Sequence, residues 1–226
     1  MRKVRLCFSL LSLAAALAAQ TPAAGTIQAT GSGTVNVNPD QVQLTVSVTT
    51  DAATASLAAQ QNATQTAAVT KALGQVLGQN GTIQTVAYSV YPRYSNTTGQ
   101  TSIIIGYTAS NTLLVTAFDL TLAGPLIDAA NQAGASSVGN LNFGLQNSDP
   151  ATQQALTLAG KEALAHAAAI AAGLGAHAGA VVSAQEGSNV SPVPVVAASG
   201  VATGTQITSG TVAVSATVTV TVQLTQ

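Results

Sequence analysis

Alternation of apolar and polar residues near the end of the chain constrains the fold most strongly. From residue 211 to residue 224 every second side chain is aliphatic, and the side chains between them are mostly Thr and Ser. A period of two places these two sets on opposite faces of a β-strand. Residues 41–49 repeat the pattern, with Val42, Leu44, Val46 and Val48 on one face. We therefore expect strands that bury one face and present hydroxyl groups on the other.

Alanine-rich segments between the strands predict two long helices. The first follows Asp51, an expected N-cap, and ends at Asn80-Gly81, where a positive φ can end a helix. Its expected apolar anchors are Leu57, Val69, Leu73, Val76 and Leu77. The second begins at Asp149-Pro150, a cap followed by a proline that suits the first turn, and runs to about Leu174. Its expected buried line is Leu156, Gly160, Ala163, Ala167, Ile170 and Leu174.

The remaining segments complete a mixed pattern of strands and helices. A short helix is expected at Leu126 to Gln132, after Pro125. We expect further strands over residues 26–37, 82–94, 101–120, 138–145 and 180–186. The first two strands of the chain are expected to form a hairpin around Asn38-Pro39-Asp40, which has the composition of a turn.

The resulting order, ββαββαβαββ, predicts an α+β fold. Residues 24–226 would form a single domain in which a largely antiparallel sheet is covered by long Ala-rich helices. Residues 187–209 are rich in Gly, Ser, Pro and Val, and we expect them to form a long, flexible, exposed loop without regular structure.

The first 23 residues have the features of a signal peptide. Three basic residues precede the apolar stretch from Leu6 to Ala19, which is too short to span a membrane. Small residues at 16–18 and 21–23 offer two cleavage sites, and an uncleaved anchor is the alternative. We therefore expect an exported protein.

Removal of this segment would change the charge and the redox chemistry. Lys71, Arg93 and Lys161 would remain against seven acids, which gives a net charge of about −4. A nucleic-acid partner is excluded by this balance, because such proteins cluster Lys and Arg to displace counterions. The only cysteine, Cys7, would also be removed, so we expect no disulfide and no thiol chemistry.

Candidate catalytic and metal-binding residues each have a simpler explanation. His166 and His177 lie eleven positions apart, about 16 Å along a helix, which is too far for one metal ion. Asp119 and Asp128 could suggest acid–base chemistry, but each has a local role at an element end or in a short helix. The sequence contains no G-x-S-x-G motif. We therefore predict no catalytic residues, no cofactor and no metal.

Four tyrosines are concentrated on the two central strands. Core and edge packing would explain them, and so would a contact between subunits, because Tyr is enriched in interfaces. Arg93 lies among them in the sequence. The subunit-contact interpretation assigns the contact to Tyr91, Arg93, Tyr94 and Tyr107.

Several short motifs, in order along residues 26–226, resemble the SIMPL-domain family, also called DUF541. They are Gly31-Ser32-Gly33, Pro39-Asp40, Tyr91-Pro92-Arg93-Tyr94, Ile105 to Asn111, Leu126 to Ala130 with Gly134-Ala135, Asn142-Phe143, Leu174-Gly175 and Gly210. The similarity includes the 26-kDa periplasmic immunogenic and outer-membrane 28-kDa-type bacterial members. The chain departs from the family pattern in its low charge, since the helix from Asp149 is usually richer in Lys and Glu.

The resemblance implies an exported bacterial protein of the periplasm or the outer membrane, whose α+β subunits assemble into ring-like homo-oligomers. It implies links to envelope and oxidative stress, and no enzymatic activity defines the family. Our leading hypothesis is therefore a non-enzymatic envelope protein that self-assembles, with its protein partner unidentified. A ligand- or peptide-binding module that uses residues 187–209 is the alternative. An outer-membrane barrel is disfavoured by the two Ala-rich helices.

Overall fold

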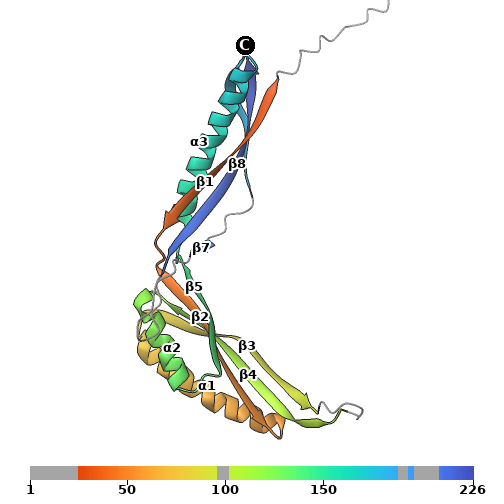
Figure 1. Cartoon of the computed structure of the whole chain (residues 1–226), viewed down its shortest axis with the longest axis vertical. Coiled ribbons are helices and arrows are strands. Elements are labelled where there is room, and N and C mark those ends of the chain that lie inside the picture. Colours follow the sequence, from red (N-terminus) through yellow and green to blue (C-terminus); the bar gives the residue numbers. More distant parts are fainter. Residues whose placement is uncertain (1–24, 96–101, 188–192, 196–208) are drawn as a thin grey trace, which may run out of the picture.

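The strand predicted most clearly, β8 (Thr211–Thr225), is the centre of the first of two antiparallel sheets. In the computed structural model, which describes residues 25–95, 102–187, 193–195 and 209–226, β8 pairs with β1 (Thr26–Val37) on one side. On its other side it pairs with β6 (His177–Glu186) and with the short strand β7 (Val193–Val195). Helix α3 (Asp149–Gly173) covers this sheet (Figure 1). We call these elements the α3 lobe.

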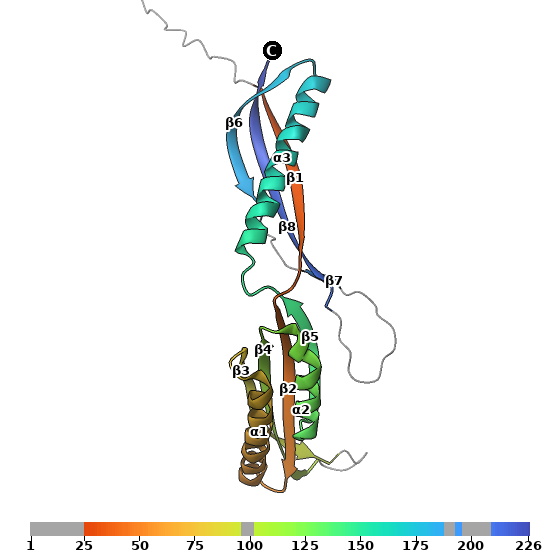
Figure 2. The ribbon, with the colours of Figure 1, turned by 90° about the vertical axis from the view of Figure 1, so that its left-hand side faces the viewer.

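The second sheet contains the other four strands, in the order β3-β4-β2-β5. Their bounds are Gln41–Ala52 for β2, Gly81–Tyr94 for β3, Ile104–Ala117 for β4 and Ser137–Gly144 for β5. Helices α1 (Ala55–Leu77) and α2 (Ala123–Gln132) cover one face of this sheet, as Figure 2 shows. The 3₁₀-helix η1 (Leu120–Leu122) leads into α2. We call this second unit the α1 lobe.

The α1 lobe is a continuous insertion between β1 and α3 of the α3 lobe. The chain enters it after β1 and leaves it after β5, and the two lobes lie end to end along the long axis (Figure 1). Polar contacts tie the entry and the exit together. The backbone N–H of Gln146 donates to the Asp40 carboxylate over 2.6 Å, and the Asp40 N–H donates to the Gly144 carbonyl over 3.0 Å. Asp40 therefore holds together the two chain segments that connect the lobes.

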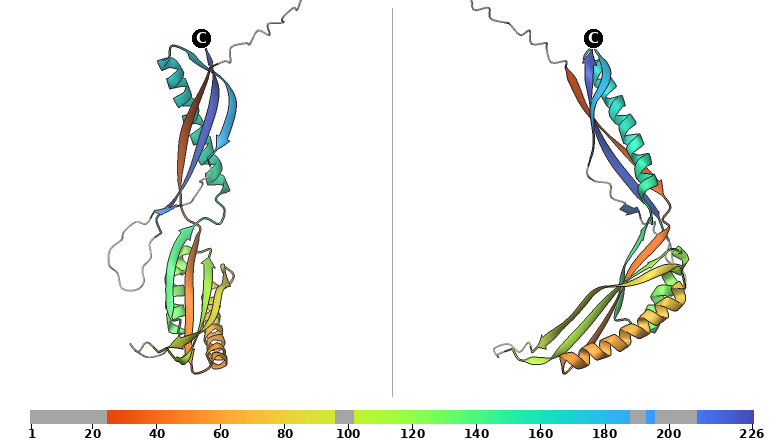
Figure 3. Two further views of the ribbon diagram at one scale, coloured as in Figure 1. Left: turned by 90° about the vertical axis from the view of Figure 1, so that its right-hand side faces the viewer. Right: turned by 180° about the vertical axis from the view of Figure 1, so that it is seen from behind.

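Each lobe has its own core. In the α1 lobe, the alternating residues of β2 and β4 pack against α1 and α2, and Val42, Val46, Val48 and Leu126 have no exposed surface. In the α3 lobe, Val212, Val214 and Val222 of β8 lie beneath α3. Figure 3 shows the helices of each lobe on one face of its sheet, and in the part of the chain that the structure describes the other face of each sheet has no helix on it.

Alanine forms the contact face of α3. The buried residues of this helix recur at every fourth position: Ala151, Ala155, Ala159, Ala163, Ala167 and Ala171. Two glycines of β1 allow the helix to approach closely. A Cβ at Gly31 or Gly33 would lie less than 3 Å from backbone atoms of α3. The helix thus rests almost backbone to backbone on β1.

The α+β class and the antiparallel pairing are confirmed, and the strands form two sheets. The predicted hairpin of the first two strands is wrong. β1 and β2 belong to different sheets, because β1 pairs with β8, which follows it by more than 170 positions in the sequence. The expectation that residues 187–209 lack regular structure is wrong at β7, which pairs with the start of β8. Residues 188–192 and 196–208 lie outside the described residues, as does the predicted signal peptide.

Three details of the predicted helices are also corrected. Thr54, whose hydroxyl accepts from the Leu57 N–H, caps α1 in place of Asp51, which lies at the end of β2. Leu57 is 44% exposed, since Ala58 and Asn62 take the buried positions of that turn. Ile170 and Leu174 of the line expected for α3 are exposed, because the close approach to β1 leaves room only for alanine. Within the described residues, no helix has the length and apolarity needed to cross a membrane.

Candidate interaction surface

The predicted subunit-contact residues lie together on the β3–β4 hairpin, at the edge of the α1 lobe. Tyr91, Arg93 and Tyr94 belong to β3, and Tyr107 belongs to β4 opposite Pro92. Alternation along β3 places Tyr91 and Arg93 on one face of the hairpin and Tyr94 on the other. Tyr107, which is opposite Pro92, shares the face of Tyr94. The side chains of the four residues therefore lie on both faces of the hairpin.

Arg93 is held in place by a neighbouring strand. Its guanidinium Nη1 lies 2.9 Å from Oδ2 of Asp51, at the end of β2, and both side chains are about half exposed. The Thr108 hydroxyl of β4 donates to the other oxygen of this carboxylate. An exposed pair of this kind contributes at most about 1 kcal/mol to stability. Its main effect is to join three strands and to neutralise the single charge of β3.

Large apolar side chains surround these residues, and most of them are exposed. We define the β3 arm as residues 86–94 and 103–105. Its exposed members are Val86, Tyr88, Val90, Tyr91, Tyr94, Ile103, Ile104 and Ile105. Ile103, at 63%, is the most exposed of them. A contiguous apolar surface of this kind commonly marks an interaction site.

The isoleucines of the β3 arm were not among the predicted contact residues. Their signal is visible in the sequence, since Ile103, Ile104 and Ile105 are consecutive. Three consecutive strand residues cannot all point to the same face of a two-stranded ribbon. Such a run, outside a strand that is buried on both faces, predicts exposed aliphatic side chains.

The backbone of β3 is also open along its outer edge. β3 is the last strand of its sheet and spans 14 residues. Among the described residues, no side chain hydrogen-bonds to its backbone. Arg93 is its only charged residue, and Pro92 near its end removes one donor. Natural proteins usually protect such edges with lysine, proline, short strands, bulges or a covering element. β3 has no lysine, but its pairing with β4 shifts register at Thr85/Ala87 and at Arg93/Tyr94, so the regular part of its edge lies between these two points.

The edge of β1 is protected, in contrast, by side chains of α3. The carboxylate of Glu162 accepts from the Ser32 N–H over 2.5 Å and from the Ser32 hydroxyl over 3.1 Å. His166 Nδ1 lies 2.8 Å from the Thr30 carbonyl oxygen. The backbone donor at Ser32, followed by its hydroxyl, lowers the pKa of Glu162. These bonds occupy edge groups of β1 that another strand would need.

The remaining candidates for chemistry stay apart from one another. His177 begins β6 and His166 lies on α3, as separate exposed residues. Asp119 accepts from the hydroxyl and the backbone N–H of Thr121, and these bonds lower its pKa. The described residues contain no group of three or more His, Cys, Asp or Glu side chains placed to hold a metal ion.

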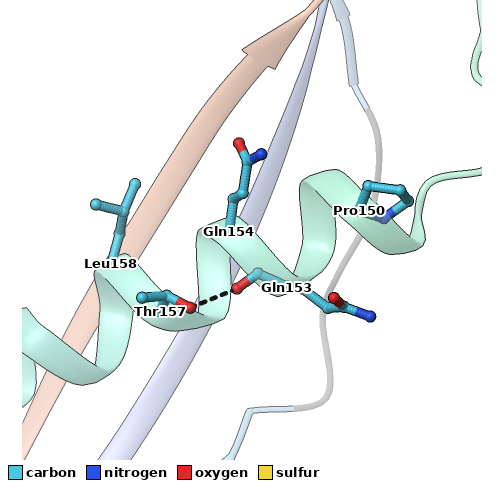
Figure 4. Close-up of a pocket in the computed structure, with 5 residues that line it drawn as sticks. All are labelled: Pro150, Gln153, Gln154, Thr157 and Leu158. Carbon is cyan, nitrogen blue, oxygen red and sulfur yellow. Dashed lines mark hydrogen bonds between the residues drawn. The ribbon is translucent and has the colours of Figure 1, made fainter.

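Two open hollows lie on the helices. One, of about 540 Å³, lies beside the first turns of α3 and is lined by Pro150, Gln153, Gln154, Thr157 and Leu158. Figure 4 shows Gln154 and Leu158 pointing to one side of the helix, with Gln153 directed away from them. The other, of about 460 Å³, is lined by Thr50, Gln60, Gln61, Thr64 and Gln65. Both are lined by neutral side chains.

The sequence matches the SIMPL family, described as proteins of unknown function (DUF541), over residues 27–222. This chain belongs to the SIMPL family. The match spans both lobes, so the two sheets together form the family's unit. No curated protein matches the sequence significantly. The family gives the fold a name but no activity, and the surfaces described above are therefore the basis for function.

Proposed function

We propose that this protein is an exported, non-enzymatic protein of the bacterial cell envelope that self-assembles through the β3 arm. The observations that carry the proposal are the outer edge of the 14-residue strand β3 and the exposed Val, Tyr and Ile side chains of the β3 arm. Its one charged residue, Arg93, is already paired with Asp51. A strand of this kind is a template for pairing with another chain. Tyr91, Arg93, Tyr94 and Tyr107 are the proposed contact residues.

The sequence supports the proposed export and location. A basic segment and an apolar stretch begin the sequence, and the residues after them carry few charges. We place the protein in the periplasm or at the outer membrane, as in the 26-kDa periplasmic immunogenic proteins that it resembles, with a role in envelope stress. Glu162 and His166 bond to the backbone of β1, and Asp119 bonds to Thr121, which supports a structural rather than a catalytic role for these side chains.

Light scattering coupled to size-exclusion chromatography tests the assembly. We expect the purified protein to form a homo-oligomer at micromolar concentration. Tyr88→Lys should shift it to the monomer, because a lysine at a strand edge opposes pairing. Ala165→Lys, on the exposed face of α3, is the matched control and should assemble like the parent. A parent protein that elutes as a monomer would refute the proposal.

A ligand- or peptide-binding module is the second candidate, and the hollow beside α3 favours it. Its neutral lining of Gln153, Gln154 and Thr157 could donate and accept hydrogen bonds to an uncharged ligand. A thermal-shift screen with peptides and neutral glycans would test it. A compound that stabilises the parent but not Gln154→Ala, while the oligomer persists in both, would favour this module.

A further inference from the structure

The strand β2 extends beyond its neighbour β5. β5 begins at Ser137, which lies opposite Ser47 of β2. β2 continues from there to Ala52, and β4 pairs with it over this whole stretch. Figure 1 shows this end of β2 beside the start of α1. The last residues of β2 therefore have a partner strand on one side only.

The hydroxyl group of Ser136 occupies the first position on this open side. The Thr49 N–H donates to Ser136 Oγ over 2.8 Å, and the same hydroxyl donates to the Thr49 carbonyl oxygen over 3.3 Å. A residue of a paired antiparallel strand makes these two bonds with its own C=O and N–H. Because backbone groups alternate in direction along a strand, the N–H and C=O of Asp51 point to the same side as those of Thr49. Within the described residues, no side chain hydrogen-bonds to these Asp51 groups.

One of the two hollows lies beside this end of β2, and we call it the α1 hollow. Its volume of about 460 Å³ is within the range of about 300–1,000 Å³ that ligand pockets occupy. Gln65 Nε2 donates to the carbonyl oxygens of Ala133 and Gly134, which holds this wall of the hollow to the turn after α2. The lining consists of one strand residue and four residues of α1: Thr50, Gln60, Gln61, Thr64 and Gln65.

The side chains around the α1 hollow suit an uncharged ligand that carries amide groups. A glutamine amide offers one acceptor and a donor group, as a peptide group does. Gln60 and Gln61 are exposed, and within the described residues their side chains form no hydrogen bond. Leu57, one turn before Gln61, is 44% exposed and adds an apolar contact. The nearby carboxylate of Asp51 is already paired with Arg93.

We propose that an uncharged peptide segment in extended conformation binds along the end of β2, in line with β5 and beside the α1 hollow. The segment pairs with the backbone of Asp51, and it displaces the Ser136 hydroxyl to pair with Thr49 as well. Every second side chain then enters the hollow. Strand addition of this kind gains affinity from main-chain hydrogen bonds and specificity from the alternate side chains. The site lies on the opposite side of β2 from β3 and does not depend on the proposed self-assembly.

Fluorescence anisotropy with a synthetic peptide tests this site on the purified protein. The probe is Thr-Val-Thr-Val-Thr, blocked at both ends and labelled with an uncharged fluorophore. We expect saturable binding, and none for the same peptide with methylated backbone nitrogens, which cannot donate to β2. Gln61→Lys should weaken binding by about tenfold or more, because it brings an unpaired charge into the hollow. Gln75→Lys, the same substitution at an exposed position later in α1, is the matched control and should bind like the parent.

Ser136→Ala provides a test of opposite sign, since it removes the hydroxyl that competes for Thr49. The affinity for the peptide should rise about fivefold, which corresponds to roughly one hydrogen bond. Circular dichroism checks that the variant is folded. An unchanged or lower affinity in a folded Ser136→Ala variant would overturn the pairing with β2.

The location of the bound peptide separates this site from the open edge of β3. A photoreactive form of the peptide, followed by mass spectrometry, should label α1 between residues 57 and 65. Labelling on β3 instead, equal binding of the methylated peptide, or no saturable binding would each overturn the proposed site. A parent protein that elutes as a monomer would refute the self-assembly and leave this inference standing.

Discussion

The close contact between α3 and β1 makes a quantitative prediction about glycine. At Gly31 an added Cβ would meet the backbone of Ala163 and Ala159, and at Gly33 it would meet that of Ala155, each closer than 3 Å. No flexible side chain can yield at these points, so α3 would have to withdraw by about 1 Å. Overpacking typically costs about 1–3 kcal/mol, and a rigid backbone neighbour places these sites at the upper end.

The change has a smaller favourable part. Alanine loses less conformational entropy on folding than glycine, which returns about 0.5–1 kcal/mol in a strand. We therefore expect Gly31→Ala and Gly33→Ala each to lower the free energy of unfolding by about 2 kcal/mol. The double variant should lose less than the sum, since one withdrawal of α3 relieves both clashes. For a chain of this size, 2 kcal/mol lowers the melting temperature by roughly 4–8 °C.

Thermal and urea unfolding followed by circular dichroism provide the assay. Gly160→Ala is the matched control, because Gly160 lies within α3 and an added Cβ would have no neighbour within 4 Å. There the better helix propensity of alanine should raise stability by about 1 kcal/mol. The opposite signs of the two substitutions are the test. If Gly31→Ala melts at or above the temperature of the parent protein, the backbone contact between α3 and β1 is refuted.

Three further predictions concern other contacts. Since the Ser32 contact lowers the pKa of Glu162 from its ordinary 4.5, it stabilises the fold at neutral pH, and this contribution is lost as the pH falls through the folded-state pKa. Glu162→Gln should therefore unfold with a smaller acid dependence than Glu186→Gln in urea at pH 7 and pH 3. Asn62→Ala should cost about 2 kcal/mol in urea unfolding, because it removes buried hydrogen bonds to the Val48 and Ala109 carbonyls. Residues 40–146 alone should give a cooperative melting curve, since they contain a complete sheet and core.

The local elements were predictable because their signals lie within a few residues. The alternation at 41–49 and 211–224 located β2 and β8. The helix end predicted at Asn80-Gly81 was three residues late, because Gly78, with a positive φ, caps α1 after Leu77, and Gly81 already begins β3. The partner of β1 was not predictable in this way. A period of two shows that one face of a strand is buried but does not identify the strand that completes its sheet. The hairpin expected around Asn38-Pro39-Asp40 relied on sequence proximity, and the chain crosses between lobes there instead.

The contact face of α3 shows a second limit of sequence reasoning. Large aliphatic residues such as Ile170 were expected inside, since large apolar side chains usually fill a core. The regular spacing of alanine from Ala151 to Ala171 carried the correct signal, together with Gly31 and Gly33 on a distant strand. Neither the alanine spacing nor the two glycines is decisive alone, because only the two together show that the backbones of the helix and the strand meet. The candidate surface was located through its tyrosines, but the openness of β3 depends on what lies beside it.

The two lobes differ in whether a helix side chain covers the outer backbone of an edge strand, and this difference leaves the β3 edge exposed. α3 lies close enough to β1 for Glu162 and His166 to reach its outer backbone, so the same close packing that stabilises the α3 lobe also closes one edge. α1 lies over the centre of its own sheet and provides no such side chain for β3. A sequence with so few charged residues has little other means to oppose strand pairing. The open edge of β3 is therefore where the proposed self-assembly would act.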